Sequence, residues 1–205
     1  WSEEPMFPFV IGYDAAEIDE IVRSETAKYA EGQKYLRGIY CGGTFAEESL
    51  IHFHKSCPDA GLFCNLNTPY AKRLADPRKS VGHALVDMGS EDFTRESPHP
   101  VFDLEQRLKR LRQEVEDPEV AVVLLDFITG PGVNEDPITP FTEACAEALA
   151  RRKGALTIIA AICGSENDPQ DVGTRERELR EAGVVVTASN YQSARLASAF
   201  LQALS

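Results

Sequence analysis

The chain alternates short, continuous apolar runs with segments in which apolar residues recur at helical spacing. Strands that are apolar throughout and separated by helices are typical of a parallel sheet covered on both faces. Right-handed crossovers between such units predict an α/β fold of the flavodoxin-like type. We expect three layers (αβα) around a five-stranded parallel sheet with strand order 2-1-3-4-5. The five apolar runs, each ending in glycine or a small polar residue, lie at 36–43, 83–89, 120–130, 156–164 and 184–190.

Capping residues mark where the helices begin. Asp14 and Glu17 form a capping-box pattern before a helix that extends to Tyr29, and Thr44 with Glu47 repeats the pattern before the next helix. Further caps, two of them followed by proline, are expected at Asp103, Thr139 and Asp168.

Two segments do not follow the alternation. Residues 1–34, an irregular lead-in over 1–13 followed by one helix, are expected to be an N-terminal extension, the end of a linker from a missing N-terminal domain. Residues 35–205 form the flavodoxin-like domain. The chain begins with Trp1, which favours a piece of a longer protein. Residues 56–82 contain three prolines and little periodicity, so we expect a long excursion there.

Composition excludes several classes of partner. Lysine and arginine total 21 against 33 acidic residues, the formal charge is −12, and no basic stripe is present, so neither nucleic acid nor an anionic membrane is expected as a partner. No apolar run approaches the roughly 20 residues of a membrane helix. Five cysteines without a CxxC pair favour a reducing, cytoplasmic location, and no metal site is expected.

The small residues at the strand ends predict an anion site. Ligands of parallel sheets bind at the carboxyl ends of the strands, and the first amides of a following helix are unpaired. Gly42, Gly43 and Thr44 form the first such turn. The alternative is that small residues serve only the tight turn, while Thr44 and Glu47 satisfy the amides of their own helix. Further glycines of this kind, also expected to contact phosphate, are Gly89, Gly130, Gly132 and Gly164.

Candidate catalytic groups lie near the same edge. His99, in the loop after the second strand, is a candidate acid, base or phosphoryl acceptor. Asp92 and Thr94 in that loop are expected to orient it or to contact phosphate. The alternative is that His99 and its two flanking prolines only shape the entry to the next helix, with Asp92 and Thr94 solvated. Asp126 interrupts a buried strand, and a buried acid needs a partner or a function, so it is a candidate positioning group.

Four motifs occur in order along residues 14–205. Together they resemble the C-terminal half of FdrA-family proteins, relatives of the succinyl-CoA synthetases, which are NDP-forming acyl-CoA synthetases. The segment from the second strand onward also resembles the ligase domain of the synthetase β subunit. The motifs are YLRGIYCGGT at 35–44, GHALVDMG at 82–89, DFT at 92–94 and PHP at 98–100 followed by Asp103.

The resemblance implies a domain that handles an acyl phosphate at its strand ends within an acyl-CoA synthetase-like ligase. It also implies that CoA or a nucleotide is bound mainly by domains absent from this chain, so the isolated domain is expected to be inactive. The implied partners are an anionic small molecule, the missing N-terminal domain and a homo- or hetero-oligomeric partner. Two alternatives stay open: a subunit of a carbamoyltransferase that acts with carbamoyl phosphate in purine-nitrogen (allantoin- or oxamate-type) catabolism, and a non-catalytic assembly domain.

One family feature is not carried over to this chain. The synthetase α subunit uses a phosphorylated histidine in a Gly-His-Ala-Gly-type loop. Here Gly82, His83 and Ala84 precede the second strand, and Leu85 replaces the last glycine. His83 is therefore expected at the amino edge of the sheet, in a structural role.

Overall fold

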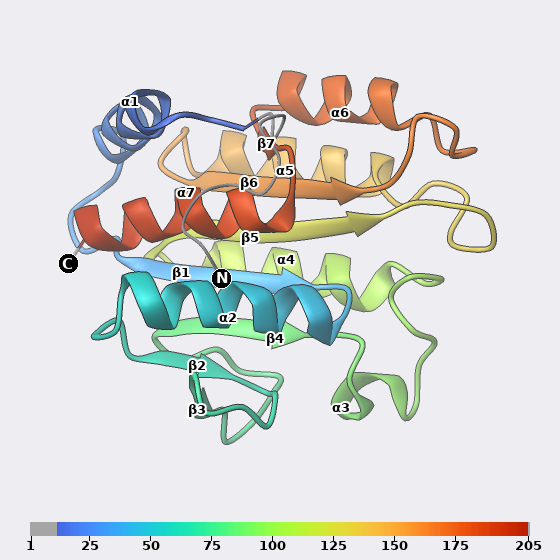
Figure 1. Ribbon diagram of the computed structural model, residues 1–205, viewed down its shortest axis with the longest axis horizontal. Coiled ribbons are helices and arrows are strands. Elements are labelled where there is room, and N and C mark those ends of the chain that lie inside the picture. The colour runs from blue at the N-terminus through green and yellow to red at the C-terminus, as the bar shows by residue number, and fades with distance from the viewer. Residues whose placement is uncertain (1–11, 205) are drawn as a thin grey trace, which may run out of the picture.

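A computed structural model describes residues 12–204 and confirms an α/β fold built on a parallel sheet (Figure 1). The lead-in expected for residues 1–13 falls almost entirely outside the described residues. The sheet has seven strands in the order β3-β2-β4-β1-β5-β6-β7, and all neighbouring strands are parallel. The five strands from β4 to β7 in this order are the predicted strands in the predicted order: β1 (Tyr35–Tyr40), β4 (His83–Asp87), β5 (Val120–Ile128), β6 (Thr157–Cys163) and β7 (Val185–Thr187).

The expectation of five strands is wrong, because the excursion over 56–82 adds two more. β2 (Leu62–Cys64) pairs with the outer edge of β4, and β3 (Lys72–Arg73) pairs with β2. At three and two residues, these strands are too short to show a recognisable period in the sequence. They form because β4 offers an unpaired edge to hydrogen-bond with.

Helices cover both faces of the sheet. In Figure 1, α2 and α7 lie in front of the sheet, and α4 and α5 lie behind it. The helices are α1 (Ala15–Thr26), α2 (Gly43–Ser56), α3 (Glu91–Thr94), α4 (Glu105–Glu116), α5 (Thr139–Arg151), α6 (Val172–Glu181) and α7 (Asn190–Ala203).

The capping predictions had different outcomes for α1 and α2. The capping box of α1 is confirmed: Asp14 Oδ1 accepts the amide of Glu17 at 2.9 Å, and Glu17 Oε2 accepts the amide of Asp14 at 2.7 Å. The box predicted at Thr44 and Glu47 is wrong, because α2 already begins at Gly43. Gly42 occupies the N-cap position in extended conformation and has no side chain with which to cap the helix.

Two later helices also begin at other residues than predicted. α6 follows Asp171, a left-handed N-cap residue (φ 52°), rather than Asp168. The Asp168 carboxylate instead accepts the amide of Ser165 at 2.7 Å. Before α4, Asp103 lies one residue outside the N-cap position and accepts the amide of Glu105 at 2.8 Å.

Two apolar clusters fill the space between the sheet and its helices. One contains residues of α4, α5 and α6, and the other contains residues of α1, α2 and α7. Neighbouring strand residues alternate between them, so that Leu124 joins one and Leu125 the other. Both strand faces are therefore buried, which is why the strands are apolar throughout. α1 contributes Ile18 and Val22 to the same cluster as Phe200 of α7.

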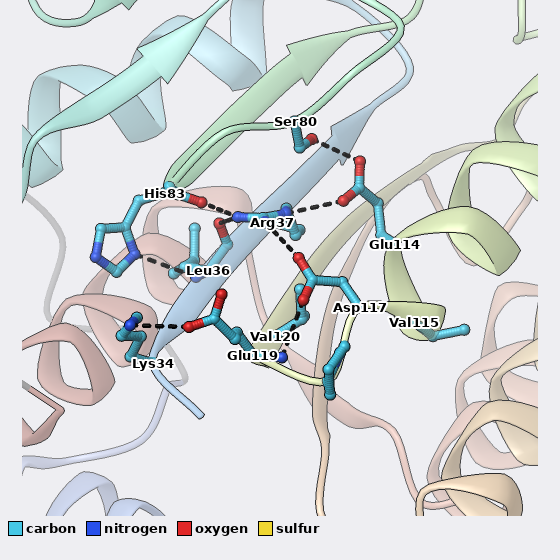
Figure 2. A network of polar contacts seen from close by, with 12 residues as sticks. Lys34, Leu36, Arg37, Ser80, His83, Glu114, Val115, Asp117, Glu119 and Val120 are labelled. Carbon is cyan, nitrogen blue, oxygen red and sulfur yellow. Dashed lines mark hydrogen bonds and ion pairs between the residues drawn. The ribbon is translucent and has the colours of Figure 1, made fainter. Parts of the chain in front are cut away.

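The amino edge of the sheet is held by a buried polar network (Figure 2). Arg37 of β1 bonds Glu114 at 2.8 Å and Asp117 at 3.0 Å. His83 lies at the amino end of β4, where its Nδ1 accepts the amide of Leu36 at 3.1 Å. Burial, assisted by the nearby Arg37 charge, lowers the pKa of His83 to about 4, so this imidazole is a neutral acceptor at neutral pH. Its position is the one expected from the sequence.

Candidate functional site

The carboxyl ends of the strands meet at one edge of the sheet, towards which the arrowheads of the central strands point in Figure 1. The crossovers after β1 and β5 leave this edge on opposite faces, because α2 packs on one side and α5 on the other. Such a topological switch point is where doubly wound sheets bind ligands. The turns at 41–43 and 129–132 follow these two strands.

The N-terminus of α2 is open at this switch point. Its N-cap residue Gly42 makes no side-chain cap, and its first turn contains no acidic residue. Among the residues that the structure describes, none accepts a hydrogen bond from the amides of Gly43, Thr44 or Phe45. Unpaired amides and the helix dipole together favour an anion at this position.

The carboxylate of Asp87 lies beside this open helix end. A Cβ atom built on Gly43 would lie 3.1 Å from Asp87 Oδ2. Asp87 Oδ1 accepts the amide of Gly89 at 2.8 Å, whereas Oδ2 has no donor within the described part of the chain. The side chain is only 6% exposed, and burial raises the pKa of Asp87. One carboxylate oxygen therefore faces the α2 terminus without a hydrogen-bond partner.

Asn65, just after β2, fixes the backbone on which Asp87 is carried. Its Oδ1 accepts the amide of Asp87 at 2.8 Å, and its Nδ2 donates to the Asp87 carbonyl at 2.9 Å and to Ser90 Oγ at 2.8 Å. Asn65 is 3% exposed. The excursion thus supports the site through a residue that sequence reasoning missed. The available signal was a polar residue directly after the short apolar run 62–64.

His99 lies in the same cluster. Its Nδ1 accepts the amide of Val101 at 3.2 Å, and its ring packs against the backbone of Gly89. A Cβ at position 89 would overlap His99 Nε2 and come within 2.6 Å of the Cys41 carbonyl oxygen. His99 also lowers the pKa of Asp87 electrostatically, opposing the effect of burial. The structure therefore brings His99, Gly89 and Asp87 together around the turn after β1.

Asp126 holds the other side of that turn. Its Oδ1 accepts the amide of Cys41 at 2.7 Å and Arg107 Nη2 at 2.9 Å. The same Nη2 donates to the carbonyl of Ile39 at 2.7 Å. Asp126 is completely buried, and burial raises its pKa against the opposing charge of Arg107. Asp126 contacts the backbone of the turn after β1 from inside the sheet, which suits a positioning group.

Arg107 was missed by sequence reasoning. It is 2% exposed, and its guanidinium lies 5.7 Å from the ring centre of Phe127 and 5.1 Å from that of Phe141. Within the described residues, Arg107 Nε and Asp126 Oδ2 have no hydrogen-bond partner. In the sequence Arg107 is one of several charged residues on a helix, so no local pattern distinguishes it.

The turns after β5 and β6 differ from the turn after β1, because protein groups already accept hydrogen bonds from some of their amides. Gly130 donates its amide to Gln170 Oε1 at 3.0 Å. At the end of β6, the Asp168 carboxylate accepts Thr129 Oγ1 at 2.6 Å, and this bond lowers the pKa of Asp168. A Cβ at Gly164 would collide with Thr129 Oγ1. Gly132 is exposed and has a left-handed backbone (φ 86°).

The predicted residues of α3 make no hydrogen bond to the turn after β1 in the described part of the chain. Thr94 Oγ1 donates to the carbonyl of Ser90, in its own helical turn, at 3.0 Å. Asp92 contacts Asn65 Nδ2 only at 3.5 Å. Asp92 also lines a cavity of about 500 Å³ between α3 and α4, whose acidic and basic side chains are nearly balanced.

A cavity of about 340 Å³ lies beside the first turn of α2, at the carboxyl ends of β6 and β7. Phe45 and Glu48 of α2 line one side, and Asn190 and Tyr191 of α7 line the other. Asn190 Nδ2 ties the two helices together by donating to the Phe45 carbonyl at 3.0 Å and to Glu48 at 2.6 Å. Of the three residues with free amides, Phe45 alone lines this cavity.

Other features of the described residues limit the chemistry further. No helix among them is long and apolar enough to cross a membrane. No group of three or more His, Cys, Asp or Glu side chains in residues 12–204 could hold a metal ion. All five cysteines are free thiols.

Comparisons with known proteins agree with this architecture. The family model of the CoA-ligase domain matches residues 39–200. YahF of Escherichia coli (strain K12), an uncharacterised protein, is 34% identical over 184 residues, which cover 88% of this chain and 35% of YahF. The chain thus spans only about a third of the length of that relative. With most of its length matched by the family model, the chain belongs to the CoA-ligase family.

Proposed function

We propose that this chain is the C-terminal domain of an FdrA-like enzyme and that it binds an acyl phosphate at the N-terminus of α2. Membership in the CoA-ligase family indicates acyl-CoA synthetase-like chemistry in general. The observation that carries the finer proposal is the set of free amides at Gly43, Thr44 and Phe45, located at the switch point of the sheet. After β5 and β6, by contrast, the amides of Gly130 and Ser165 donate to Gln170 and Asp168.

Each neighbouring residue has a distinct part in this proposal. The α2 amides bind phosphoryl oxygens, and Asp126 holds the turn in place through the Cys41 amide. His99, whose ring lies against Gly89, is near enough to the turn to exchange a proton or accept a phosphoryl group. These three groups come from α2, β5 and the loop between α3 and α4, so only the folded sheet assembles them.

The side chains at this edge do not fit a whole CoA molecule. A CoA or nucleotide carries several phosphates, which proteins hold with lysine and arginine as well as with helix amides. The cavity beside α2 is lined by Glu48 and by no lysine or arginine. We therefore expect CoA or a nucleotide to be bound mainly by parts of the enzyme outside this chain, and we derive no step through it.

A second candidate is favoured by one observation. Asp87 Oδ2 is a hydrogen-bond acceptor without a donor, and it lies beside the proposed phosphate site. An acyl group with only an alkyl substituent leaves this oxygen unpaired, whereas a carbamoyl group carries an amide that can donate to it. This favours a carbamoyltransferase subunit that uses carbamoyl phosphate as the alternative function.

Isothermal titration of the chain with acetyl phosphate, carbamoyl phosphate, inorganic phosphate and CoA tests the proposal. In Gly43→Val the new side chain would press on Asp87 Oδ2 and lie near Leu66, so we expect phosphate-compound affinity to fall by about tenfold or more. Gly173→Val, also in the first turn of a helix but facing open space, is the matched control and should bind like the parent. If the folded parent chain binds none of the phosphate compounds, the proposal is refuted and an assembly role is favoured.

A further inference from the structure

The Asp87 carboxylate is an unusual neighbour for an anion site. A free helix N-terminus attracts negative charge, yet a carboxylate fixed beside it repels a second anion. Asp87 is not free to move away, because Asn65 holds both its amide and its carbonyl, and Gly89 holds Oδ1. The Gly43 amide and Asp87 Oδ2 are neighbours, since a Cβ on Gly43 would lie 3.1 Å from that oxygen.

The surroundings of Asp87 do not supply the missing donor. Burial raises the pKa of Asp87, and the negative charges of Asp126 and Asp92 raise it further. The Gly89 amide and His99 lower the pKa of Asp87, but the Gly89 amide bonds Oδ1, and no hydrogen bond joins the His99 ring to Oδ2 in the described residues. Asp87 Oδ2 thus has no donor among the described residues, and it is not one of their fully buried unpartnered atoms, so a ligand can reach it beside Gly43. A ligand that donates to Oδ2 gains a hydrogen bond to a charged group, whereas a ligand without a donor there displaces solvent from the oxygen and leaves it unpaired.

We infer that Asp87 is the specificity-determining residue of this site. Its free oxygen selects ligands that place an N–H or O–H donor next to the oxygen atoms held by the α2 amides. It discriminates against ligands of the same size that present a methyl group or a lone-pair oxygen there. This inference rests on the proposed function, since it takes the α2 terminus as the anion site.

Carbamoyl phosphate and acetyl phosphate form a matched pair of probes, because carbamoyl phosphate carries an amino group where acetyl phosphate carries a methyl group. We expect the parent chain to bind carbamoyl phosphate about tenfold or more tightly, the scale of a hydrogen bond to a charged group. In Asp87→Asn one amide oxygen can still accept the Gly89 amide, while the Nδ2 group replaces the free acceptor with a donor. The preference should then disappear or reverse.

Glu91→Gln is the control for charge. It removes one negative charge from the helix just after the Asp87 loop, and Glu91 lies exposed on α3. Its ratio of carbamoyl to acetyl phosphate affinity should equal that of the parent. Circular dichroism and thermal unfolding establish that each variant is folded before its affinities are compared.

The outcomes separate the inference from the proposed function. Equal affinity of the parent chain for both probes, lost in Gly43→Val, would overturn the selectivity of Asp87 but leave the anion site in place. A preference that survives in folded Asp87→Asn would also overturn it and would make Asp87 a partner of the helix dipole only. Absence of binding by either probe would defeat the proposed function and the inference together. If Asp87→Asn does not fold, the ratio measured on the parent chain still decides.

Discussion

The Arg107–Asp126 ion pair allows a quantitative test of how the turn after β1 is held. Asp126 has no exposed surface, Arg107 is 2% exposed, and the two side chains meet at 2.9 Å. Arg107→Met keeps an apolar stem between the rings of Phe127 and Phe141 but leaves a buried carboxylate without its cation. Removing one partner of a buried pair typically costs about 3–5 kcal/mol, and we expect a loss of unfolding free energy in this range at neutral pH.

The pH dependence of that loss reports on the Asp126 carboxylate itself. Burial already raises the pKa of Asp126, and Arg107 opposes this effect, so removing Arg107 should raise the pKa further. Between the unfolded pKa of an aspartate, about 3.9, and this raised value, the folded state binds a proton that the unfolded state does not. Stability of the variant should therefore fall as the pH rises through that window, relative to the parent protein. The penalty should be smallest in acid and largest above neutrality.

The free energy of unfolding is measured by urea unfolding at several pH values. Three proteins are compared: the parent, Arg107→Met and the double variant Arg107→Met/Asp126→Asn. Asparagine keeps an oxygen for the Cys41 amide and removes the charge, so the double variant should recover about 2 kcal/mol of the single-variant loss. It should also lose the added pH dependence. A single-variant loss below about 1 kcal/mol, with the pH profile of the parent, would show that the pair does not work as described.

Two further predictions concern packing and protonation elsewhere. Gly89→Ala should destabilise the protein by about 1–3 kcal/mol in urea unfolding, because the added methyl overlaps His99 and the Cys41 carbonyl oxygen. The control Gly173→Ala, in open space within α6, should stabilise the protein by about 0.4–1 kcal/mol. Equal effects of the two substitutions would contradict the tight contact at position 89. Because the pKa of His83 is lowered from 6.5 to about 4, the unfolded state binds more protons between these values, so stability should fall as the pH drops from 6.5 to 4. His83→Gln should flatten that slope in urea midpoints measured across the same range, and an unchanged slope would assign it to other groups.

Local and periodic features of this protein were readable from its sequence. The five apolar runs predicted five of the seven strands and their order, because strands buried on both faces must be apolar throughout and crossovers have a fixed hand. The capping box of Asp14 and Glu17 was predictable because both partners lie within one helical turn. The sequence also predicted that a ligand would bind at the carboxyl edge of the sheet, since the position of the binding edge is a property of the topology.

Only the tertiary structure decided which groups meet at that edge. β2 and β3 exist because β4 offers them an edge, and Asn65 reaches the Asp87 backbone across 22 positions of sequence. Arg107 reaches the end of β5 from a neighbouring helix, and no local pattern distinguishes it from solvated arginines. Within the described residues, the first amides of α2 have no acceptor because Gly42 has no capping side chain. In the turns after β5 and β6, Gln170 accepts the Gly130 amide and Asp168 accepts the Ser165 amide. Such contacts join residues far apart in the chain, so their partners are set by packing and not by spacing.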